Sequence, residues 1–175
     1  MDRLWAPWRM SYLDQIGSDA SRPGACFLCA ARDARDDREA LVFLRRKRAF
    51  AMLNRFPYNN GHTLIVPHDH KGELADLGDE TLLEILTLTR DVLGLLRRFM
   101  RPDGFNVGLN VGRVAGAGLP EHLHFHVVPR WSGDTNFMPV LGETKVIPQS
   151  LDELYDQVCR AAAGDEPAAG TRSQP

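Results

Sequence analysis

The chain has no excess of positive charge, because its 21 Lys and Arg residues are matched by 23 Asp and Glu residues and its formal net charge is −2. A surface dedicated to nucleic acid normally requires a basic excess, so we expect small phosphorylated ligands bound by local groups rather than polymers. The sequence also has no apolar run long enough to span a membrane, and its first residues lack the pattern of a signal peptide. We therefore expect neither a nucleic acid nor a membrane as a partner.

Cysteine is scarce, and three residues are too few for a disulfide framework. Two of them form the segment Cys26-Phe27-Leu28-Cys29, whose thiols could bind a metal, form a redox pair or pack as small apolar groups. The third, Cys159, falls in a helical pattern and is expected to lie inert in the core. This use of cysteine predicts a reducing compartment, the cytoplasm.

The length and composition predict one compact core. With 175 residues, 43% of them hydrophobic and 25% charged, the chain is too short for two full domains. We expect an N-terminal segment with the Cys-x-x-Cys pair over residues 1–38 and a catalytic domain over 39–150. A helix over 151–163 and a disordered tail over 164–175 follow.

Short segments rich in β-forming residues predict five strands, over residues 40–44, 49–53, 62–66, 105–110 and 123–128. Apolar residues recur at intervals of three and four from residue 80 to 100, which predicts one long helix with Asp79 as its N-cap. Ser150 and Glu153 form a capping box that opens a C-terminal helix. The pattern predicts an α+β domain with a five-stranded antiparallel sheet covered on one face.

Three of the six histidines stand two residues apart in the segment His122-Leu123-His124-Phe125-His126. Side chains alternate between the faces of a strand, so we expect the three imidazoles on one face and the apolar residues in the core. Such a stripe could consist of hydrogen-bonded structural histidines, bind a catalytic metal, or attack phosphorus as a nucleophile. Cupins also carry a His-x-His pair, but no Glu follows here at their spacing.

Nucleophilic catalysis would give neighbouring histidines separate tasks. A neutral His124 would attack the α-phosphorus of a nucleotide ester or anhydride, and a second acceptor would resolve the nucleotidyl-histidine. Its other ring nitrogen then requires an acceptor, most simply a backbone carbonyl on the adjacent strand or loop. His126 is placed to donate to a phosphoryl or leaving oxygen. Glycines in the loop over residues 112–118 would let backbone N–H groups approach a phosphate.

The alternating histidine motif, the segment from Asn54 to Pro67 and the strand before the motif together resemble the histidine triad (HIT) family of nucleotide-binding hydrolases and transferases. The resemblance covers residues 39–131, and the flanks extend it to residues 3–150. The flanks Trp5-Ala6-Pro7-Trp8-Arg9 and Pro129-Arg130-Trp131 look like a bacterial branch that includes phosphorylases of diadenosine tetraphosphate. The resemblance implies a HIT-like fold and a homodimer joined edge to edge through its sheets.

The resemblance also implies roles for individual residues. His124 and His126 would be catalytic, and nucleotide-binding positions would be Asn54, His62, Asn110, Gly116, Ala117, Gly118, His126 and Trp131. Asn54 could equally begin a turn, His62 could be a buried structural histidine, and Trp131 could cap the core instead of stacking on a purine. Many family members place a Ser or Thr hydroxyl near the leaving phosphate where this chain has Ala117 and Gly118, which leaves phosphorolysis and hydrolysis open.

A structural zinc site is implied by several branches of the family, which add two histidines to a Cys-x-x-Cys pair. In this chain the four ligands would be Cys26, Cys29, His70 and His122, with His68 as a competitor of His70. A bound metal would make His122 structural and leave the chemistry to His124 and His126.

We therefore expect an enzyme that cleaves adenine dinucleoside polyphosphates at the α-phosphate through a nucleotidyl-histidine, with diadenosine tetraphosphate phosphorylase (ATP adenylyltransferase) favoured. Its partners would be adenine nucleotides and, for a phosphorylase, inorganic phosphate. Hydrolysis of dinucleoside polyphosphates or adenosine phosphoramidates is the alternative within the class. A catalytically idle nucleotide-binding protein is the alternative outside it.

Overall fold

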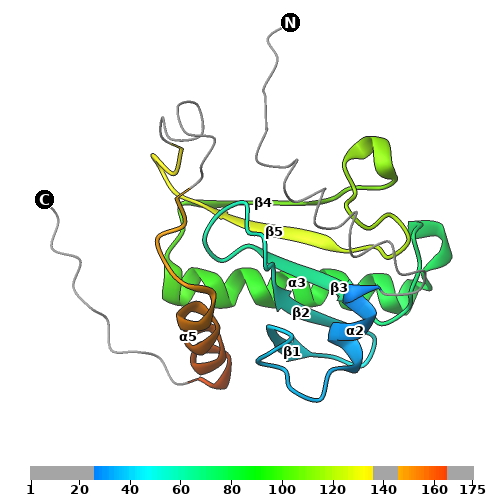
Figure 1. The fold of residues 1–175 in the computed structure, drawn as a ribbon, viewed down its shortest axis with the longest axis horizontal. Helices are drawn as coiled ribbons and strands as arrows, with labels where there is room; N and C mark the ends of the chain where they lie inside the picture. The colour runs from blue at the N-terminus through cyan, green and yellow to red at the C-terminus, as the bar shows by residue number, and fades with distance from the viewer. Residues whose placement is uncertain (1–25, 136–145, 165–175) are drawn as a thin grey trace, which may run out of the picture.

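A computed structural model describes residues 26–135 and 146–164 and shows an α+β fold (Figure 1). Its elements, in chain order, are α2 (Phe27–Asp33), β1 (Val42–Arg45), β2 (Ala49–Leu53), β3 (Thr63–Pro67), η1 (Leu74–Asp76), α3 (Asp79–Met100), β4 (Gly104–Leu109), η2 (Arg113–Ala115), β5 (Phe125–Arg130) and α5 (Leu151–Ala163). The five strands form one antiparallel sheet in the order β1-β2-β3-β5-β4. The predicted fold class is confirmed.

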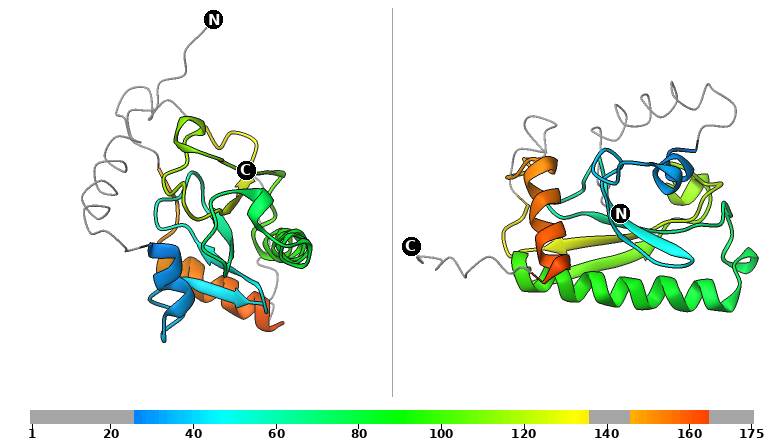
Figure 2. Two further views of the ribbon diagram at one scale, coloured as in Figure 1. Left: turned by 90° about the vertical axis from the view of Figure 1, so that its right-hand side faces the viewer. Right: turned by 90° about the horizontal axis from the view of Figure 1, so that it is seen from below.

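The long helix α3 covers one face of the sheet, as Figure 2 shows. It buries the stripe of Ile85, Leu88 and Val92 against residues such as Ala51 and Ile65 of the central strands. The predicted N-cap is wrong by one position. Gly78 is the N-cap, and Asp79 is the first helical residue, where its carboxylate lies near the positive end of the helix dipole.

The opposite face of the sheet is also covered over β2 and β3, which the sequence analysis did not predict. Leu28 and Ala31 of α2 pack there against a cluster that includes Phe50, Leu64 and Val66. Because alternate side chains of β2 and β3 enter two different cores, every residue of these strands is buried. Helix α2 thereby brings its Cys-x-x-Cys segment onto the sheet.

The C-terminal helix α5 packs against α3 and β1. Ser150 is its N-cap, as predicted, and its side chain accepts a hydrogen bond from the N–H of Glu153 at 3.3 Å. The Tyr155 hydroxyl donates to the carbonyl of Val42 at 2.8 Å, which anchors the helix to β1. Cys159 lies partly buried beside the core.

The last strand begins later than predicted, at Phe125 instead of Leu123. The pairing with β3 and β4 therefore ends at Phe125, and His122 and His124 lie in the stretch before the strand. Here the N–H of Leu123 donates to the carbonyl of Lys71 at 2.7 Å, so the backbone is satisfied outside the sheet ladder. Three imidazoles therefore do not share one face of a strand.

Other expectations fall partly outside the described residues. The flank at residues 5–9 lies outside them, and so do residues 165–175 of the tail predicted over 164–175. The boundaries at residues 38, 150 and 163 stay predictions. Within the described ranges, no helix has the length and apolar character to cross a membrane.

Candidate active site and metal centre

The start of β3 and the start of β5 bring three of the predicted histidines together. Because Leu64 of β3 pairs with His126 of β5, the imidazole of His62 reaches across to His126. The Nε2 of His62 lies 2.9 Å from the Nδ1 of His126, and the ring centroids of His124 and His126 are 5.0 Å apart. His62 and His124 are almost completely buried.

Hydrogen bonds fix which nitrogens of this group carry protons. The Nδ1 of His62 accepts a hydrogen bond from the backbone N–H of Tyr58 at 3.0 Å, and the Asn54 side-chain amide lies 3.2 Å from the same nitrogen. The proton of neutral His62 is therefore on Nε2, which donates to the Nδ1 of His126. It follows that neutral His126 carries its own proton on Nε2 and can donate it.

Burial keeps His62 neutral. Desolvation of the imidazole, with a smaller contribution from the neighbouring His126, lowers the pKa of His62 to about 3. His62 therefore acts as a fixed hydrogen-bond donor to His126 and not as a base near neutral pH.

His124 has the opposite arrangement. Its Nδ1 lies 2.9 Å from the carbonyl oxygen of His122, an acceptor only, so Nδ1 carries the proton and Nε2 keeps its lone pair. Burial lowers the pKa of His124, which holds the ring in this neutral form. The predicted carbonyl acceptor is present, and it comes from the same segment two residues earlier.

Cys26, Cys29, His70 and His122 form a separate cluster in which all potential ligand atoms lie within 4.8 Å of one another. The Nδ1 of His122 is 3.2 Å from the Cys26 Sγ, and the Nδ1 of His70 is 3.1 Å from the Cys29 Sγ. A tetrahedral zinc with ordinary Zn–S and Zn–N lengths would place such atoms about 3.5 Å apart. The donor set therefore fits zinc.

The tautomer of His122 agrees with metal binding. The Nε2 of His122 donates to the carbonyl of Pro67 at 2.9 Å, which leaves the Nδ1 lone pair facing the thiols. Burial raises the pKa of the Cys26 thiol to about 11, and a cation between the ligands would counter this by stabilising the thiolate. His68 stays outside the cluster, with its Nε2 3.0 Å from the carbonyl of Arg46.

The glycine loop lies between β4 and β5. Gly112 and Gly116 adopt positive φ angles of 78° and 91°, which explains why glycine stands at both positions. Asn110, predicted to contact the nucleotide, donates to the carbonyl of Gly116 at 3.5 Å and so ties the end of β4 to this loop. Ala117 is buried, and the sequence of the loop offers backbone donors only at residues 116–118.

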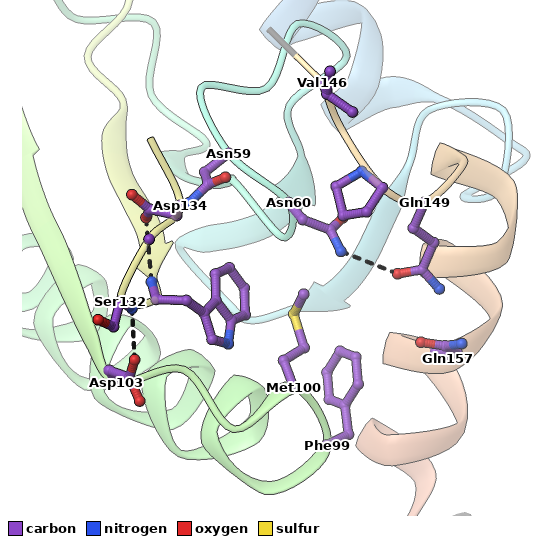
Figure 3. A pocket seen from close by; sticks show the side chains of 13 residues that line it. Asn59, Asn60, Phe99, Met100, Asp103, Ser132, Asp134, Val146, Gln149 and Gln157 are labelled. Carbon is purple, nitrogen blue, oxygen red and sulfur yellow. Dashed lines mark hydrogen bonds between the residues drawn. The ribbon is translucent and has the colours of Figure 1, made fainter. Parts of the chain in front are cut away.

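The structure does not bring Trp131 to the histidines. Trp131 follows the far end of β5 and lines a cavity of about 720 Å³. Figure 3 shows this cavity, with Met100 and Phe99 among the labelled lining residues. The ends of α3 and β5 form this cavity together with residues around the start of α5, and Phe99 and Met100 contribute apolar wall. The proposed stacking of Trp131 on a purine held at His124 therefore stays a prediction, which the contacts within one chain do not support.

Tyr58 is a residue of the site that the sequence analysis missed. Its ring centroid lies 4.6 Å from that of His62 and 5.7 Å from that of His126. The only available signal was its position four residues before His62, in a segment whose composition is typical of a turn.

Comparison with known proteins gives the following similarities. Residues 35–133 match the HIT domain. An AP-4-A phosphorylase of Mycobacterium tuberculosis is 43% identical over 86% of this chain and 79% of its own length. An adenosine 5′-monophosphoramidase of Schizosaccharomyces pombe is 28% identical over 63% of this chain and 79% of its own. A crystal structure of a zinc-bound histidine triad family protein from Mycobacterium smegmatis is 25% identical, has a TM-score of 0.63, and is matched over 80% of this chain and 94% of that one.

The geometry of the cluster predicts different effects for two nearby histidines. His70→Asn should abolish stoichiometric zinc binding because it removes one of four ligands, whereas His68→Asn should keep one zinc per chain. Metal content by mass spectrometry after dialysis measures this, and the thiolate charge-transfer band of the cobalt-substituted protein reports the coordination. Zinc retained by His70→Asn and lost by His68→Asn would reverse the ligand assignment.

Proposed function

Because the chain belongs to the HIT family, we propose that it transfers nucleotidyl groups through His124, with phosphorolysis of diadenosine tetraphosphate as its leading activity. The choice of substrate rests on the 43% identity to an AP-4-A phosphorylase over most of both chains. The protonation pattern of His124 and His126 supports the chemistry, because it supplies a nucleophilic nitrogen beside a hydrogen-bond donor.

In the first step, the Nε2 of His124 attacks the α-phosphorus of the substrate. A phosphorus–nitrogen bond forms while the bond from phosphorus to the bridging oxygen breaks, and ATP leaves from diadenosine tetraphosphate. The carbonyl of His122 stabilises the positive charge that develops on the His124 ring, since it accepts a hydrogen bond from the Nδ1–H. His126 donates from Nε2 to the oxygens that gain charge.

In the second step, an acceptor oxygen attacks the same phosphorus, and the bond to His124 breaks. Inorganic phosphate as acceptor gives ADP, whereas water gives AMP. The backbone N–H groups of the glycine loop over residues 112–118 would bind phosphate oxygens in both steps. No Ser or Thr hydroxyl is available at Ala117 and Gly118, so binding there depends on the backbone.

Zinc is the metal we propose for the cluster of Cys26, Cys29, His70 and His122, in line with the zinc-bound relative from Mycobacterium smegmatis. Bound zinc would supply structural cross-linking between α2 and the segment before β5. Metal binding by this cluster requires reduced thiols, which supports a location in the cytoplasm. Cell fractionation with detection of the chain would test this location.

Hydrolysis of adenosine phosphoramidates is a second candidate. The specific observation in its favour is the similarity to an adenosine 5′-monophosphoramidase. The same two steps would serve it, with an amine as the leaving group and water as the acceptor.

The activity is tested by incubating the protein with diadenosine tetraphosphate with and without inorganic phosphate and separating the nucleotides by anion exchange. We expect ADP and ATP only with phosphate, and a loss of at least about 10³-fold in kcat for His124→Ala, because the nucleophile is removed. AMP and ATP without phosphate would instead establish a hydrolase. Turnover of a phosphoramidate alone would select the second candidate, and binding without turnover of either would identify an idle nucleotide-binding protein.

We also propose a homodimer in which β4 strands pair edge to edge. Among the described residues, no strand pairs with the outer edge of β4, and its central residues are exposed. Val107, in the middle of this edge strand, is 47% exposed. An unpaired edge strand with an exposed valine at its centre is suited to pairing with a second copy.

The dimer is tested by measuring molar mass with light scattering after gel filtration. Val107→Lys should shift the mass from two chains to one, since a lysine at the edge opposes strand pairing. Val146→Lys changes a valine of similar exposure that is not part of β4 and should leave the mass unchanged. A monomeric wild-type chain, or a dimer that tolerates Val107→Lys, would contradict the proposed interface.

A further inference from the structure

Tyr58 makes two different contacts with the histidine pair. Its backbone N–H donates to the Nδ1 of His62 at 3.0 Å, which fixes the proton of His62 on Nε2. Its ring covers both imidazoles, with an interplanar angle of 34° to His62 and a stacked angle of 20° to His126. One residue therefore touches both partners of the 2.9 Å hydrogen bond between His62 and His126.

Tyr58 and His62 differ in their exposure to solvent. Tyr58 is 36% exposed, whereas His62 beneath it is 1% exposed. The partly exposed ring lies against the buried imidazole of His62 and so contributes to keeping solvent from it. A hydrogen bond shielded from water is stronger and better oriented than an exposed one.

The turn that carries Tyr58 is fixed to the sheet through the next residue, Asn59. The side chain of Asn59 donates to the carbonyl of Pro129 at 3.0 Å and to Asp134 at 2.8 Å, and the N–H of His62 donates to the carbonyl of Asn59 at 3.1 Å. Asn59 is itself buried. These bonds hold the turn against β5 and give the tyrosine ring a defined place over the histidines.

We propose that Tyr58 is a positioning residue for the transfer reaction, which acts by shielding and orienting the His62–His126 hydrogen bond so that His126 presents its Nε2 proton to the phosphate oxygens. This inference rests on the proposed function for its effect on turnover. The proposed role belongs to the aromatic ring and not to the backbone. Every substitution except proline keeps the backbone N–H, so side-chain variants test the ring alone. The hydroxyl is not required.

The test compares Tyr58→Phe, which keeps the ring, with Tyr58→Leu, which removes it. We expect Tyr58→Phe to keep kcat for diadenosine tetraphosphate within twofold, and Tyr58→Leu to lower kcat by about tenfold with KM within twofold. Phe56→Leu, which removes an exposed aromatic ring from the same turn, should leave both constants unchanged. Thermal unfolding of each variant checks that the fold is retained.

A second readout needs no turnover. In the ligand-free protein, proton NMR should show the low-field Nε2–H of His62 in slow exchange for the wild type and for Tyr58→Phe. The resonance should broaden through exchange with water in Tyr58→Leu. If diadenosine tetraphosphate is not a substrate, the resonance still decides the role of Tyr58.

Three results would overturn the proposal. They are an unchanged Nε2–H resonance in Tyr58→Leu, an equal loss of kcat in Tyr58→Phe and Tyr58→Leu, and a rise in KM alone. The last result would make Tyr58 a ligand-stacking residue.

Discussion

The hydrogen bond from the Nδ1 of His124 to the carbonyl of His122 is the interaction on which the rest of the site depends. A buried imidazole that must attack phosphorus needs its lone pair on a defined nitrogen and its proton on the other. A backbone carbonyl meets this need without introducing a second titrating group. The chain provides this carbonyl by ending the sheet pairing at Phe125, so that the backbone of His122 and Leu123 is not used by the ladder.

His122 connects this bond to the metal cluster. Its carbonyl accepts from His124, its Nε2 donates to Pro67, and its Nδ1 faces the thiols of the Cys-x-x-Cys segment. The same short stretch of chain thus belongs to the candidate metal centre and to the candidate nucleophile. His126 is fixed independently of the metal cluster, by the hydrogen bond from His62, which is itself held by the backbone N–H of Tyr58. The two histidines therefore have opposite tautomers, because the Nδ1 of His124 faces a carbonyl acceptor whereas the Nδ1 of His126 faces the Nε2–H donor of His62.

The five strands and the helices α3 and α5 were predictable from the sequence, because hydrophobic periodicity and turn residues mark them directly. The short helix α2 was not predicted. The set Cys26, Cys29, His70 and His122 was predicted by resemblance, and the structure brings all four together. What the sequence did not provide was the conformation before β5, since alternation of His and apolar residues favours a strand whether or not a partner strand is present. Tyr58 as a neighbour of the histidines and the place of Trp131 in the wall of a cavity were not predicted, because both depend on how segments distant in the sequence pack. The nucleotide-binding roles of the loop residues stay predictions.

Covalent nucleotidylation of His124 is the step on which the proposed reaction depends. The most direct test is to mix the protein with diadenosine tetraphosphate in the absence of phosphate, quench within the first turnover, and locate any adduct by mass spectrometry of peptides. We expect one adenylyl group on His124, which disappears when phosphate is added before the quench. Turnover without any adduct, or an adduct on a residue other than His124, would contradict it.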